Sequence, residues 1–104
     1  MSTESTELVL LIDNDEPLYR QRTAIFRALA KKKDRNVYDR NLAPKAFMPL
    51  TAAAAKRYMR VFGSPGDKWN HVFSPIDRRQ AAVQLTEEFE AWYEVDYQAM
   101  KRPT

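Results

Sequence analysis

Residues 17–33, PLYRQRTAIFRALAKKK, decide the fold class because their apolar side chains recur at helical spacing. At about 100° per residue, one broad face collects Leu18, Tyr19, Ile25, Phe26 and Leu29. The opposite face carries a basic stripe of Arg20, Arg27 and Lys31. Asp15 suits the N-cap position, and a proline is tolerated in the first turn of a helix. The stretch therefore predicts an amphipathic helix that begins near its proline.

Residues 47–61 keep helical spacing across an interior proline. Their apolar stripe consists of Phe47, Leu50, Ala54, Tyr58 and Val61. Because this stripe is continuous, we predict one helix bent at Pro49, where the missing N–H removes a hydrogen bond. Asp39 is the predicted N-cap and Gly63 the predicted stop. The outer face of this helix carries Lys45, Lys56 and Arg60.

Residues 74–77, Ser-Pro-Ile-Asp, predict the start of a third helix, with serine as the cap and proline in the first turn. Its apolar face consists of Ala82, Leu85, Phe89, Trp92, Tyr93 and Met100. A short turn around Trp69 precedes it. Three main helices and a short fourth predict a mainly α fold, arranged as a small helical bundle. We expect its core to contain Phe26, Leu29, Phe47, Tyr58, Phe62, Phe89 and Trp92.

The N-terminal segment is ambiguous. Residues 8–12, LVLLI, have the composition of a short strand, although a helical turn packed on the core fits equally well. We favour a short extended segment. Residues 1–7 are polar, so we expect a flexible N-terminus at 1–7 and a single helical domain at 8–104.

Composition and motifs argue against catalysis. The 104-residue chain has no cysteine, which excludes disulfides and thiolate zinc sites. Its one histidine, His71, has no ligand spacing to the nearest acids, and no phosphate-binding glycine loop is present. We therefore expect no catalytic residue, no metal site and no cofactor. With no signal sequence and no long apolar run, we expect a soluble cytoplasmic protein that does not enter a membrane.

The charge pattern favours a binding function. The net charge is +3, but residues 17–62 hold twelve Lys or Arg against two acids, while both flanks are acidic. A clustered basic face can follow a phosphate backbone, so nucleic acid is the expected partner. The candidate residues are Arg20, Arg27, Lys31, Lys32, Lys33, Lys45, Lys56 and Arg60.

The alternative is a protein-binding accessory or inhibitor that docks on host machinery. Its candidate anchors are Tyr19, Trp69 and Tyr97, because aromatic side chains dominate protein interfaces. If Glu87, Glu90 and Glu94 pack across the basic stripe as ion pairs, this alternative is favoured.

Arg22 interrupts the apolar face of the first predicted helix. It is buried against a carboxylate, such as Asp39 or an acid of the last helix, or it anchors an interface. Neither role is catalytic.

Four segments resemble a family of small uncharacterised proteins carried by phages and plasmids, mostly in proteobacteria. They are Leu18 to Lys33, Val37 to Ala43, Ala54 to Tyr58 and Phe62 to Trp69, so the resemblance covers about residues 17–90. The family has no assigned activity and therefore supplies no functional residues. The resemblance implies a bacterial, mobile-element setting.

Overall fold

The structure, a computed structural model, describes residues 2–101, and these are mainly helical with no strand among them. The longer helices are α1 (Thr3–Asn14), α2 (Glu16–Asp34), α3 (Pro44–Phe62) and α5 (Pro75–Trp92). The short elements are α4 (Trp69–Val72), the π-helical turn η1 (Tyr93–Tyr97) and α6 (Gln98–Lys101). The predicted mainly α class is confirmed.

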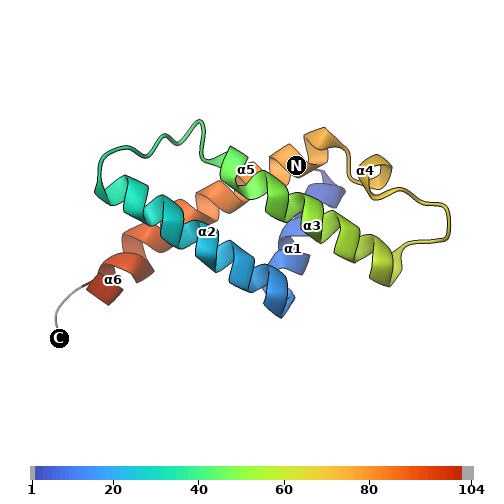
Figure 1. Cartoon of the computed structure of the whole chain (residues 1–104), viewed down its shortest axis with the longest axis horizontal. Helices are drawn as coiled ribbons and strands as arrows, with labels where there is room; N and C mark the ends of the chain where they lie inside the picture. Colours follow the sequence, from blue (N-terminus) through green and yellow to red (C-terminus); the bar gives the residue numbers. More distant parts are fainter. Residues whose placement is uncertain (1, 102–104) are drawn as a thin grey trace.

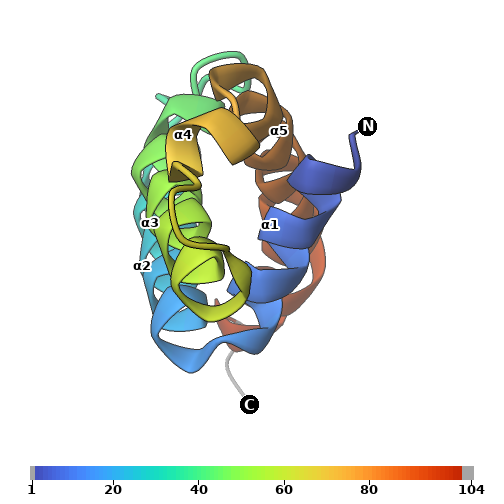
Figure 2. The ribbon, with the colours of Figure 1, turned by 90° about the vertical axis from the view of Figure 1, so that its right-hand side faces the viewer.

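The helices form two layers around one core. In Figure 2, α2 and α3 lie on one side of the molecule and α1 and α5 on the other, with α4 across the end. Figure 1 shows α2 and α3 running side by side in opposite directions. Residues 17–33 and 44–62, which make up nearly all of α2 and α3, contain no acidic residue. One layer of the fold is therefore basic along its length.

The N-terminal segment is helical, so the predicted extended segment at residues 8–12 is wrong. Leu8 and Ile12 are fully buried, and both lie on the inner face of α1 because they are four residues apart. Ser2 caps the helix by accepting a hydrogen bond from the Ser5 N–H, 3.1 Å away. Residues 3–7, which we expected to be flexible, form the first turns of α1. No partner strand exists among residues 2–101, so a helix satisfies the backbone groups of this apolar run internally.

The core is built around four fully buried phenylalanines. Phe26 contacts Phe47 and Phe89 edge to face, with ring centroids 5.8 and 5.6 Å apart. Phe73, which we did not predict, is also fully buried and packs edge to face on Tyr58 at 5.1 Å. This contact arises because the link before α5 folds back against α3.

The predicted core holds for most of its members. Leu29 is buried as expected, and Tyr58 and Trp92 are partly buried against the core. Phe62 is wrong: 65% of it is exposed, because it is the last residue of α3 and lies beyond the covering helices.

The continuity of α3 across Pro49 is confirmed, whereas Asp39 as its N-cap is wrong. The helix begins at Pro44 and has Pro49 in its interior. Asp39 instead organises the preceding turn: its Oδ1 accepts a hydrogen bond from the Asn41 N–H at 2.8 Å, and its backbone carbonyl accepts one from Ala43. The first N–H groups of the helix need no capping side chain, because Lys45 and Ala46 donate to the carbonyls of Leu42 and Ala43.

We expect Pro49→Ala to stabilise the protein. Pro49 is exposed, so the change leaves the core packing intact and restores one helical N–H. Proline costs about 3 kcal/mol in a helix interior. It also restricts the unfolded chain, which stabilises the wild type by about 1 kcal/mol that the alanine variant loses, so a net gain of about 1–2 kcal/mol is expected. Urea unfolding at constant m-value measures it. A loss of stability would show that the bend itself is required for packing.

Candidate nucleic-acid interface

The outer surface of the α2 and α3 layer carries two basic stripes, which we call the outer basic face. They consist of Arg20, Arg27 and Lys31 on α2 and Lys45, Lys56 and Arg60 on α3. All six residues are exposed. At about 100° per residue each stripe lies opposite the buried side of its own helix. Figure 2 shows α2 and α3 in one layer. Because each stripe lies opposite the buried side of its helix, we infer that both stripes face outward from this layer.

The acidic side chains of α5 and η1 pair with basic residues at the edge of this layer and not with the two stripes. Glu90 pairs with Arg40 at 3.2 Å, and Glu94 pairs with Lys33 at 3.7 Å. Glu87 makes no ion pair with any residue between 2 and 101. The arrangement that would have favoured the protein-partner alternative, with these acids packed across the basic stripe, is therefore absent from the described part of the chain.

Within the stripes only Arg20 has an acidic partner, Glu16, one turn earlier on the same helix. Arg27 and Lys31 have no carboxylate within 4 Å among the described residues, and the same holds for Lys45, Lys56 and Arg60. An exposed pair such as Arg20 with Glu16 is worth little and can open when a phosphate approaches. The positive charge of the outer basic face is therefore available to a ligand.

The remaining two basic candidates, Lys32 and Lys33, occupy different settings. Lys32 lines a cleft of about 390 Å³ between the end of α2 and the start of α3, together with Lys45 of the outer basic face. Lys33 is turned away from the stripe: its ammonium lies 4.8 Å from the Tyr93 ring centre and pairs with Glu94. We leave Lys33 out of the outer basic face because its charge is already engaged.

Arg22 is partly buried in an ion cluster between α1, α2 and α5. Its Nε lies 3.3 Å from an oxygen of Asp13 and 3.7 Å from one of Glu88, and its guanidinium covers Phe26 at 4.2 Å. Glu88 is the carboxylate of the last helix that was considered as a partner of Arg22, but the nearer partner, Asp13 on α1, was not predicted. Asp39, the other carboxylate considered, is not its partner.

Burial raises the pKa of Glu88 to about 7, and the Asp13 charge adds to the rise while Arg22 opposes it. The folded-state pKa thus lies above the ordinary value of 4.5. The protonated form of Glu88 is favoured in the folded state. Its contribution to the free energy of unfolding is therefore fully present below pH 4.5 and is lost as the pH rises through about 7.

We expect the free energy of unfolding to fall by about 1–2 kcal/mol between about pH 5 and about pH 8, after discounting for partial exposure of the carboxyl. Glu88→Gln should remove most of this dependence and make the protein more stable than wild type at the higher pH. Thermal melts over this range measure it. Glu87→Gln is the matched control, since it removes the same charge from an exposed neighbour on α5. Equal pH profiles for the two variants would contradict the assignment.

Tyr97, one of the predicted interface anchors, is used within the fold. Its hydroxyl donates to Asp34 at 2.9 Å, and that of Tyr93 donates to the other Asp34 oxygen at 2.6 Å. The Tyr93 hydrogen bond is the main cause that holds the pKa of Asp34 below its usual value, with smaller help from Lys101 and Tyr97. The cluster fastens the C-terminal turns to the end of α2.

The other two predicted anchors lie apart. Tyr19 is exposed near the start of α2, whereas Trp69 is partly buried in α4 at the end of the molecule away from α6 (Figure 1). Sequence reasoning therefore identified aromatic residues that do not share a surface.

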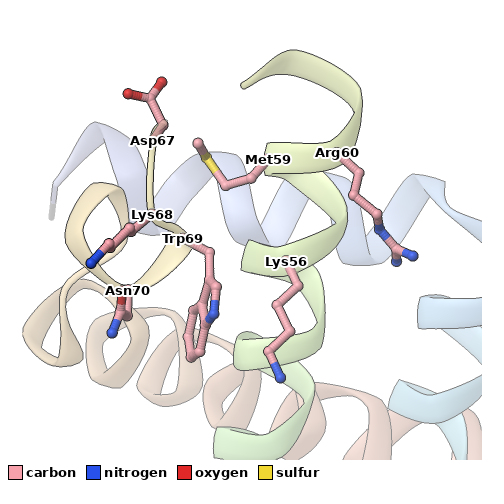
Figure 3. A pocket seen from close by; sticks show the side chains of 7 residues that line it. All are labelled: Lys56, Met59, Arg60, Asp67, Lys68, Trp69 and Asn70. Atoms are coloured by element: carbon pink, nitrogen blue, oxygen red, sulfur yellow. The ribbon is translucent and has the colours of Figure 1, made fainter. Parts of the chain in front are cut away.

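A groove beside Trp69 was not predicted. It has a volume of about 680 Å³ and is lined by Lys56, Met59, Arg60, Asp67, Lys68, Trp69 and Asn70. Figure 3 shows Trp69 between Lys56 on α3 and the wall formed by Lys68 and Asn70. The exposed loop at 63–68 brings these residues together. Helical periodicity in the sequence does not predict a contact that depends on the path of a loop.

Comparisons with known proteins identify no relative: no family model, curated protein or solved structure matches the chain. The resemblance to phage- and plasmid-borne proteins therefore stays a prediction. Within residues 2–101 no helix is both long and apolar enough to cross a bilayer. The same residues contain no cluster of three or more potential metal ligands.

Proposed function

We propose that this protein binds nucleic acid through the outer basic face, by contacts to backbone phosphates. One observation carries the proposal: the two helices of one layer hold six exposed cations in outward stripes, with no acidic residue between positions 17 and 33 or between 44 and 62. A solvated surface of an ordinary domain intersperses both signs of charge. Two helices that carry acids only at the ends of α2, Glu16 and Asp34, instead maintain a positive field between those ends.

The dimensions of the face suit a nucleic-acid backbone. At about 1.5 Å of rise per residue, the stripe on α3 spans about 22 Å from Lys45 to Arg60, and that on α2 about 16 Å from Arg20 to Lys31. Phosphates follow one another at about 3.4 Å per base pair along the axis of one strand, so the longer stripe spans about six base pairs. Such contacts favour binding without sequence preference.

Titration against duplex DNA at two salt concentrations tests the proposal. Six phosphate contacts predict a slope of about −5 in log affinity against log salt, and a loss of about 10³ in affinity between about 50 and about 200 mM salt. No detectable binding at the lower concentration, or an affinity independent of salt, would overturn it.

Binding to a protein of the host, as an accessory or inhibitor, is the second candidate function. The observation that favours it is a mainly apolar cleft of about 260 Å³ where α1 meets the end of α3, lined by Glu7, Leu10, Leu11, Tyr58 and Phe62. Leu10 and Phe62 are 56% and 65% exposed there. This candidate becomes the preferred one if neither duplex nor single-stranded DNA binds at low salt. Binding of a protein through this exposed apolar cleft should depend only weakly on salt.

A further inference from the structure

The groove beside Trp69 combines an aromatic ring with several cations. The Lys56 ammonium lies 5.0 Å from the centre of the indole ring, and the Arg78 guanidinium lies 4.9 Å from it. Arg78 is anchored, since its Nε donates to the Phe73 carbonyl at 3.2 Å. Lys56 is exposed on a flexible stem and can leave the ring. Trp69 is thus held by one fixed cation and covered by one movable cation.

Asp67, the acidic residue among those that line the groove, does not repel an anion bound beside the Trp69 ring. Asp67 points away from Trp69 in Figure 3, and its carboxylate accepts a hydrogen bond from the Ser64 N–H at 3.2 Å. Lys56 and Lys68 flank the ring instead. Lys68, like Lys56, has no carboxylate within 4 Å among the described residues.

The groove is continuous with the outer basic face. Lys56 belongs both to the stripe on α3 and to the lining of the groove, and Arg60 lies one turn further along the same helix. Arg60 also lines the groove, and Figure 3 shows its side chain extending away from Trp69. A strand that lies along α3 would therefore reach the ring directly after its contact with Lys56.

We propose that the groove binds one unpaired nucleotide of the nucleic acid held by the outer basic face. Its base stacks on Trp69 in the place of the Lys56 ammonium, which moves with Lys68 to the phosphate, while Arg60 holds the neighbouring phosphate. The volume of about 680 Å³ falls within the range of about 300–1,000 Å³ that is typical of ligand sites. Stacking requires a base outside the duplex, so single strands make a contact that duplexes lack. The nucleotide site depends on the proposed function, because the strand must already lie along the stripe.

Fluorescence tests the stacking directly. Trp69 and Trp92 are the only tryptophans, so the Trp92→Phe variant reports Trp69 alone. Titration with oligo(dT) or oligo(U) of about 12 nucleotides, a length that covers one stacking site, should quench this emission saturably. The quenching is expected because a stacked base contacts the indole ring. An abasic strand of the same length has the same phosphates and no bases, and should bind more weakly without quenching.

Binding by variants supplies the second readout. Trp69→Ala should weaken oligo(dT) binding by about 5- to 100-fold, the effect of removing the platform for one stacked base, and leave duplex affinity within about twofold. Trp69→Leu keeps an apolar side chain against the core and serves if the alanine variant is unfolded by circular dichroism. Tyr19→Ala is the control, since it removes an exposed aromatic ring outside the groove.

The binding results separate the two proposals. If wild type binds duplex DNA with the expected salt dependence but binds oligo(dT) and the abasic strand equally, the nucleotide site is wrong and the proposed function stands. If no nucleic acid binds, the proposed function is wrong and the nucleotide site with it.

Discussion

Phe89→Ala is expected to lower the free energy of unfolding by about 3–5 kcal/mol, the usual cost of a cavity left by a buried aromatic side chain. Phe89 is fully buried, and its ring packs against Phe26, Tyr38, Trp92 and Tyr93 with centroids 5.5 to 6.2 Å apart. Domains of this size have a total stability of about 5–15 kcal/mol, so a large share is at stake.

Thermal and urea unfolding measure this effect. For a domain of about 100 residues each kcal/mol shifts Tm by about 4–8 °C, so the variant should melt at least about 12 °C lower. Phe62→Ala is the matched control, because it truncates the same residue type where it is exposed and touches chiefly Tyr58. Its cost should stay below about 1 kcal/mol. Similar costs for both variants would mean that α5 does not pack through the face described.

Reversing two charges on α2 is expected to have the largest effect on binding. The double variant Arg27→Glu and Lys31→Glu should bind duplex DNA about 10- to 100-fold more weakly and reduce the salt slope by about 2, because two phosphates are no longer neutralised. Both side chains are exposed and lack acidic partners among the described residues, so thermal stability should change by less than about 0.5 kcal/mol.

A matched comparison separates position from net charge. Arg27→Glu alone and Arg79→Glu alone change the net charge equally, but Arg79 lies exposed on α5 in the opposite layer. Only Arg27→Glu should reduce the salt slope by about 1. If Arg79→Glu weakens binding as much, the protein binds through its overall charge and not through the outer basic face.

Local pattern alone predicted the parts of this protein that depend on one helix at a time. The buried faces of α2 and α5, the continuity of α3 across Pro49 and the two basic stripes follow from helical periodicity. Three residues assigned to apolar faces are wrong, because Tyr19, Val61 and Met100 are 45%, 57% and 60% exposed. Each stripe lies opposite a buried face, and that relation is a property of a single helix. The mainly α class follows from the same signal.

Packing between distant segments decided the rest. Residues 8–12 form part of a helix whose inner face is covered by α2, α3 and α5. A run of five apolar residues does not by itself distinguish a strand from a buried helix. Phe62 stayed exposed and Phe73 became buried according to where α3 ends and how the next link folds back. The groove around Trp69 joins residues from α3, a loop and α4, while Arg22 meets acids from both ends of the chain. Pattern in one segment reports which side of that segment is covered, but only the packed structure determines what covers it.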